Sequence, residues 1–356
     1  MNRNEKLAYR VLFTAAAIYN IVFAVWSGLA SHQFFAMVDA PVPDGWRFVA
    51  PIVGLFALCY AYAACWPERI TSTLAVGLGL ASKVAGPQFW LMALMMGEST
   101  PRLFPLLLVG GLLWWLPFIV YLTRRLPFRA VVPIAWCFGI HLFANIYLLR
   151  VAGGTELVES LAQRQAFVLE RTWLWVATWL FWSLSSISLL GFCAAWATRI
   201  KQSRSSIAFA LAVIAVGVGF DLYGETVLIT RATRDQSVAE FTSIVRQYQF
   251  VGPGVANGLY CVGGVMLSIL SWRAGFLRGT AGILGFLVWV VGFGLTAAAF
   301  ADHRLAMIAC GGGVMLLFLP WSLLVAVTMV LAAQGRSTET PSASSKPSNS
   351  SAPRSS

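Results

Sequence analysis

Residues 207–230 read IAFALAVIAVGVGFDLYGETVLIT. At 1.5 Å per residue, a helix of this length crosses the roughly 30 Å hydrocarbon core of a bilayer. We therefore predict a transmembrane helix at about 206–230. Its outer half contains two carboxylates, Asp221 and Glu225, although a charged side chain costs about 2.5–3.5 kcal/mol at the bilayer centre. These two residues are the strongest indication of function in the sequence.

Apolar segments of this kind recur along the whole chain. Of its 356 residues, 58% are hydrophobic and 11% are charged, whereas soluble domains contain about 25% charged residues. We therefore predict an all-α polytopic integral membrane protein with about ten transmembrane helices. Spans of roughly 17–25 residues are predicted near 9–30, 48–66, 71–96, 103–123, 130–149, 172–197, 206–230, 250–272, 279–300 and 305–331.

The spans divide the chain into three parts. We predict a four-helix membrane module at 1–126, a six-helix membrane module at 127–333, and a disordered Ser/Pro-rich cytoplasmic tail at 334–356. An even number of spans places both termini on one side. The loops and termini on that side carry fifteen Lys and Arg residues and three acidic residues. On the other side, nine arginines are balanced by nine acidic residues. Because basic loops stay in the cytoplasm, both termini are predicted to be cytoplasmic.

The composition also argues against several classes of protein. We attribute the net charge of +11 to membrane topology and to attraction by anionic lipids, and we expect no nucleic-acid partner. None of the six cysteines forms a C-x-x-C pair, so no metal site is predicted. Haem would require a pair of ligands such as His141 and His303; we instead expect His141 and Asn145 to form hydrogen bonds between helices. We predict no cofactor.

Three motifs in the first third of the chain resemble those of one family. They are PIVGLFALCYAYAACWPER at 51–69, SKVAGP at 82–87 and LLWWLPFIVYL at 112–122. Residues 9–123 resemble the short four-helix DoxX-like bacterial membrane proteins, and the remainder is similar to uncharacterised bacterial multi-pass membrane proteins. The resemblance implies a bacterial inner-membrane location but no activity. It also implies an Asn-Asp pair beside Lys83, where this chain has Gly110 and Gly111, so the lysine would lack that partner.

Lys83, Asp221 and Glu225 are the three charges predicted inside the membrane. Asp221 and Glu225 are four residues apart and share one helix face. Burial and a neighbouring negative charge both favour the neutral form of a carboxylic acid, so we expect at least one of them to be protonated. Lys83 is the predicted charge partner of Asp221.

Three interpretations of these groups remain open. In the structural one, the charges pair or are hydrogen-bonded and have no other role. In the second, a carboxylate takes up and releases protons while a small or lipophilic molecule is bound or transported; this is the function that we predict, rather than catalysis. In the third, the protein is a quinone-linked redox subunit, and a bound quinone exchanges protons with Asp221 or His141. No catalytic residue is assigned. The candidate ligand-facing residues are Lys83, His141, Asn145, Asp221, Tyr223, Glu225, Asn257 and Tyr260.

The two long outer loops have a helical pattern of their own. Apolar residues recur three and four positions apart at 156–173 and at 234–250, which is typical of amphipathic helices. Such helices could shield the loops or form a lid over a cavity near Glu225. The expected partners are membrane lipids and a small-molecule ligand, and a second copy of the chain is left open.

Overall fold

The computed structural model of the chain describes residues 1–42, 46–95, 99–125, 128–151, 160–201 and 203–338. Every regular element in these ranges is a helix, which confirms the all-α prediction. Nine helical segments among the described residues are long and apolar enough to cross a membrane. The helix at Ile70–Met95 coincides with the remaining predicted span. The chain is therefore a multi-pass membrane protein.

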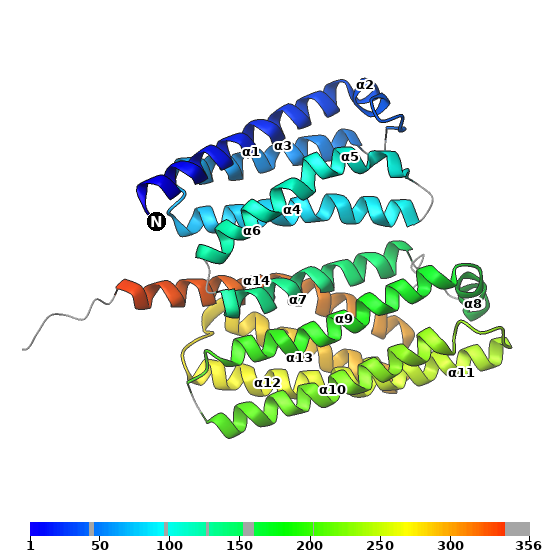
Figure 1. Cartoon of the computed structure of the whole chain (residues 1–356). Coiled ribbons are helices and arrows are strands. Elements are labelled where there is room, and N and C mark those ends of the chain that lie inside the picture. The colour runs from blue at the N-terminus through cyan, green and yellow to red at the C-terminus, as the bar shows by residue number, and fades with distance from the viewer. Residues whose placement is uncertain (43–45, 96–98, 126–127, 152–159, 202, 339–356) are drawn as a thin grey trace, which may run out of the picture.

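The helices form two neighbouring bundles (Figure 1). In the first, α1 contacts α3, α3 contacts α4, and α4 contacts α6. The short segment η2 is a π-helix directly before α6. The elements are α1 (Arg3–Leu29), α2 (Ser31–Ala36), α3 (Trp46–Cys65), α4 (Ile70–Met95), η1 (Pro101–Leu103), α5 (Phe104–Leu107), η2 (Leu108–Leu112) and α6 (Leu113–Arg125).

The second bundle is a closed ring of six long helices. Helix α7 contacts α9, α9 contacts α10, and α10 contacts α12. Helix α12 contacts α13, α13 contacts α14, and α14 contacts α7 again. Helix α6 contacts α7 and so joins the bundles. The elements are α7 (Phe128–Ile146), η3 (Tyr147–Val151), α8 (Leu161–Glu170), α9 (Thr172–Ala197), α10 (Arg204–Thr230), α11 (Val238–Gln249), η4 (Phe250–Ala256), α12 (Asn257–Arg273), α13 (Gly279–Phe300) and α14 (Arg304–Thr338).

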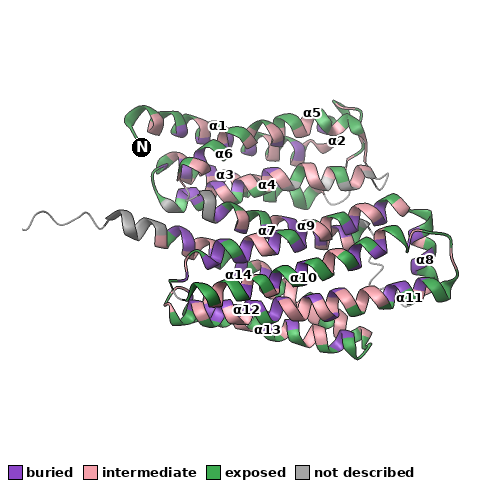
Figure 2. Cartoon of the chain, turned by 60° about the horizontal axis from the view of Figure 1, so that its bottom comes forward, coloured by how far each residue is buried: buried purple, intermediate pink, exposed green. Residues whose placement is uncertain are grey.

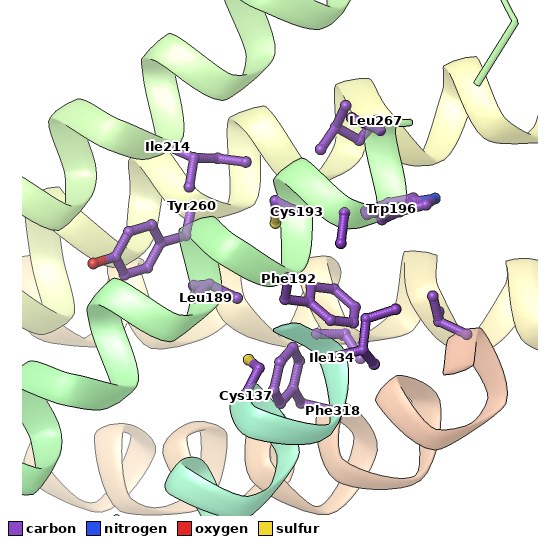
Figure 3. Close-up of a cluster of buried hydrophobic side chains, with 14 of the residues drawn as sticks. Ile134, Cys137, Leu189, Phe192, Cys193, Trp196, Ile214, Tyr260, Leu267 and Phe318 are labelled. Atoms are coloured by element: carbon purple, nitrogen blue, oxygen red, sulfur yellow. The ribbon is translucent and has the colours of Figure 1, made fainter. Parts of the chain in front are cut away.

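Burial follows the membrane pattern rather than that of a soluble domain. Buried residues lie on the inward faces of the helices, while large apolar side chains such as Leu29, Phe48 and Leu316 are exposed (Figure 2). These outward apolar side chains are suited to contact with lipid. Each bundle has its own apolar core, and part of the second core is drawn in Figure 3. The division into modules at 126 stays a prediction.

Two predicted boundaries require correction. Helix α14 continues to Thr338, five residues into the stretch predicted as tail, and residues 339–356 lie outside the described part of the chain. The span predicted from 250 is the continuation of a helix that begins at Val238. A capping box between Ser237 and Glu240 starts this helix, and its π-helical turn η4 accommodates Pro253, which lacks the N–H of a regular helix.

Both predicted outer-loop helices are present within the described ranges, as α8 and α11. They contact each other, and Gln165 Nε2 donates to the carbonyl of Gln236 at 2.6 Å. Phe241 and Ile244 of α11 are buried against Val168 of α8 and Trp175 of α9. The two helices therefore lie together at the ends of α9 and α10, and we call them the outer cap after the side on which these loops are predicted. Both the beginning of α1 and the end of α14 lie at the opposite end of the helices (Figure 1).

Candidate functional site

Helices α9, α10 and α12 bring four polar side chains together in the second bundle. Ser186 and Tyr260 donate hydrogen bonds to Asp221 Oδ2 over 2.7 Å and 3.1 Å. Ser186 Oγ also lies 3.5 Å from Glu225 Oε1. We call Asp221, Glu225, Ser186 and Tyr260 the acidic cluster. In Figure 3 the Tyr260 hydroxyl points away from the other labelled core side chains.

Glu225 is the most deeply buried acid of this cluster. Its exposed fraction is 1%, and its Oε2 atom has no hydrogen-bond partner among the described residues. Asp221, one turn away on α10, is half-buried. The two carboxyl groups therefore share a helix face, as predicted from their spacing.

Ser186 lies between the two acids and constrains their protons. It has one hydroxyl hydrogen, and its reachable acceptors include the Trp182 carbonyl at 3.2 Å as well as both carboxyl groups. Asp221 is the closest of the three, so it is the acceptor that the geometry favours. Ser186 Oγ can then accept a hydrogen bond from a protonated Glu225. This arrangement can accommodate one proton on the acid pair.

The π-helical turn η4 passes directly beside Asp221. A Cβ atom at Gly252 would lie 3.2 Å from Asp221 Oδ1 and 2.9 Å from the ring of Tyr248. Glycine is therefore required for the backbone to approach the carboxylate this closely. The Tyr248 ring in turn contacts Trp179 in an edge arrangement, with centroids 4.8 Å apart. An acid oxygen and an aromatic wall thus meet at Gly252.

Lys83 does not pair with Asp221, so that prediction is wrong. Lys83 lies in α4 of the first bundle, where its Nζ atom donates to Asn20 Oδ1 at 2.5 Å and to the carbonyl of Gly110 at 2.7 Å. The rings of Tyr19 and Trp114 lie 5.0 Å and 5.9 Å from the ammonium. Gly110 is part of the π-helix η2. A backbone carbonyl thus bonds Lys83 at the first position of the Asn-Asp pair that the family resemblance implied.

Three other predicted residues serve packing. His141 Nδ1 bonds the Cys137 carbonyl at 2.8 Å, and Asn145 Nδ2 donates to the His141 carbonyl at 2.8 Å. Both hydrogen bonds lie within α7. The prediction that these two side chains bond other helices is therefore wrong for the hydrogen bonds described here. Asn257 does connect two helices, because its Nδ2 donates to the Gly292 carbonyl at 2.6 Å. None of these three bonds reaches the acidic cluster.

Of the remaining candidates, Tyr260 belongs to the acidic cluster and Tyr223 does not. Tyr223 is 52% exposed, and its hydroxyl accepts a hydrogen bond from Gln247 of α11 at 3.0 Å. It therefore connects α10 to the outer cap.

Sequence reasoning missed Ser186, Tyr248, Gly252 and Asn20. The run SLSSIS at 183–188 places several hydroxyls in one apolar helix and could have indicated Ser186. Its neighbour Ser185 bonds a carbonyl of its own helix, while Ser183 bonds the Trp179 carbonyl and also interacts with the Glu225 carboxyl, so the run alone does not select one serine. Asn20 is a lone amide in a predicted span, which is also typical of a buried donor or acceptor.

No family model, curated protein or solved structure matches this chain. The resemblance of residues 9–123 to DoxX-like proteins stays a prediction. The function must be inferred from the chemistry of the acidic cluster itself.

Proposed function

We propose that this protein transports a small or lipophilic molecule across the membrane and that Asp221 and Glu225 carry the coupled proton. One observation carries the proposal. Glu225 is buried in a membrane-spanning helix with an oxygen that no described residue bonds, and it shares the Ser186 hydroxyl with a second acid. Intramembrane acids in such settings are typical of proton relays.

The donors to the acid pair support this interpretation. The described residues that donate to Asp221 are Ser186 and Tyr260, both neutral hydroxyls. A doubly ionised pair held only by neutral donors would be strongly disfavoured, because burial and mutual repulsion both oppose the second charge. The stable state is therefore one in which a proton or a bound cation compensates the pair.

The helix beside the pair contains a π-helical turn. Single π-helical turns inside membrane or soluble helices occur frequently at functional sites. Here η4 interrupts the long helix at the level of Asp221, and Thr296 Oγ1 of α13 donates to the Gly254 carbonyl at 3.3 Å. The π-turn is thus held by a neighbouring helix next to the proposed proton site.

The proton-carrying step is tested by infrared spectroscopy of protein in lipid, titrated with pH. Wild type should show a carbonyl-stretch band of a buried carboxylic acid that Glu225→Gln removes. A rapid pH step applied to proteoliposomes on a solid support should produce a transient charge displacement, also lost in Glu225→Gln. Glu170→Gln, which changes an exposed acid at the outer cap, is the matched control and should behave as wild type.

Two outcomes would overturn this proposal. A wild-type protein with neither the carbonyl band nor the charge displacement carries no exchangeable proton at Glu225. A stoichiometric quinone in the organic extract of purified protein would instead favour the redox subunit. Ordinary lipid in that extract agrees with transport.

We further propose that the location is a bacterial inner membrane with both termini in the cytoplasm. The excess of basic residues on the side of the termini supports this orientation. In chains with Cys65→Ser, a cysteine introduced as Lys201→Cys should be protected from a membrane-impermeant maleimide in intact cells, and one introduced as Asp235→Cys should be labelled. The reverse pattern would invert the topology.

A further inference from the structure

We infer that the acidic cluster binds a lipophilic organic cation in exchange for a proton. The inference rests on the proposed function and adds the substrate class. In the exchange the cation enters, Glu225 or Asp221 releases its proton, and the net charge of the site stays the same. Burying a cation there avoids the cost of an uncompensated carboxylate in the membrane.

The first argument for a cation is the unused acceptor capacity of the cluster. Glu225 Oε2 is buried without a described donor. Asp221 Oδ1 lies against Gly252, while the hydroxyl donors reach Oδ2. These two oxygens lie on one face of α10, and a positively charged group is the ligand whose presence stabilises them most.

The second argument is the aromatic surface next to those oxygens. The ring of Tyr248 contacts the same glycine as Asp221 Oδ1, and Trp179 packs on that ring. Aromatic faces attract organic cations through their quadrupole, more strongly in a desolvated site. A carboxylate beside aromatic rings is suited to an apolar organic cation.

The third argument separates this ligand class from a metal ion. The described residues contain no group of three or more His, Cys, Asp or Glu side chains that could hold a metal. Val227 and Leu228, which follow Glu225 on α10, are buried in an apolar cluster that also contains Trp179. Calcium takes six to eight oxygen ligands, whereas a lipophilic cation gains from the apolar contacts.

The probe for the test is tetraphenylphosphonium, with neutral triphenylphosphine oxide as its control. Binding to purified protein in detergent is measured by equilibrium dialysis at two pH values. Wild type should bind the cation at least tenfold more tightly at pH 8 than at pH 5.5, and binding in weak buffer should release protons. Triphenylphosphine oxide should show neither effect. Excess Na⁺ should not displace the cation.

Two pairs of variants test the site itself. Glu225→Gln should lower the affinity at least tenfold, while Glu170→Gln leaves it unchanged. Gly252→Ala adds a methyl group between Asp221 and Tyr248 without changing charge, and it should also weaken binding severalfold. Gly219→Ala, on α10, meets nothing within 4 Å and serves as its control.

The outcomes separate this inference from the proposed function. Equal binding of the neutral probe, pH-independent affinity, or displacement by Na⁺ would each overturn the substrate class. If the Glu225-dependent carbonyl band and charge displacement are then intact, proton coupling stands with a different substrate. Should Glu225→Gln fail to fold, the wild-type pH dependence and the neutral probe still decide.

Discussion

Replacing Asn20 with leucine should destabilise the first bundle by about 2 kcal/mol, because a hydrogen bond to a charged group contributes roughly 1.5–3 kcal/mol. Asn20 is 1% exposed and Lys83 is 6% exposed, so neither solvent nor another described side chain replaces the lost acceptor. Lys83 would keep the Gly110 carbonyl and the two aromatic rings. Thermal unfolding of the purified protein in detergent measures the loss.

The rescue by a second substitution identifies the cause. Lys83→Met alone removes a costly buried ammonium but leaves the oxygens of Asn20 and Gly110 without its donor, so it should itself destabilise by about 1–3 kcal/mol. Combined with Asn20→Leu, it should recover most of the loss. Recovery will be incomplete because Asn20 also donates to the Val53 carbonyl at 3.0 Å. A double variant no more stable than Asn20→Leu would show that Lys83 does not depend on this amide.

Gly263→Ala should destabilise the second bundle by about 2 kcal/mol, within the 1–3 kcal/mol typical of overpacking. The added Cβ would lie 2.8 Å from the Ala210 carbonyl oxygen and 2.5 Å from Ile214 Cγ1. A side chain can rotate away, but a helix carbonyl cannot, so α10 and α12 must separate. The same shift should weaken the hydrogen bond from Tyr260 to Asp221.

Thermal unfolding of Gly263→Ala beside Gly219→Ala checks this prediction. Both substitutions replace a helical glycine. Gly263 lies at the contact of α12 with α10 and faces a backbone atom, whereas Gly219 is exposed on α10 with nothing within 4 Å. The two variants should therefore differ clearly in melting temperature. Equal stability would mean that the helices are not as closely packed as described.

The fold class follows from the sequence because membrane spans are a local property. A run of about twenty apolar residues forms a membrane-spanning helix because its length matches the bilayer thickness, and distant contacts are not needed to specify it. Boundaries are less local: the capping box at Ser237 and the π-turn at Pro253 merge a loop helix with a span. Hydropathy cannot detect this merging, because both segments are separately well formed.

The candidate site was only partly predictable. Spacing along one helix places Asp221 and Glu225 on the same face, and this part of the prediction is confirmed by the shared contact with Ser186. The partner of Lys83 was not predictable, because pairing between buried charges depends on which helices touch. A backbone carbonyl at Gly110 and an amide at Asn20 have no distinct pattern in sequence.

The closed ring of six helices limits how the acidic cluster can open. Rocking one half of a ring against the other requires two separate interfaces to part at once. A change at η4 requires only local contacts to part, and Pro253, which lacks the N–H of a regular helix, keeps the π-turn at this point of the helix. Moving this turn would carry Gly252 and Tyr248 away from Asp221 while the contacts between the other helices of the ring stay intact. Under the proposed function, a local movement at η4, rather than a hinge between domains, is therefore the opening that the closed ring favours.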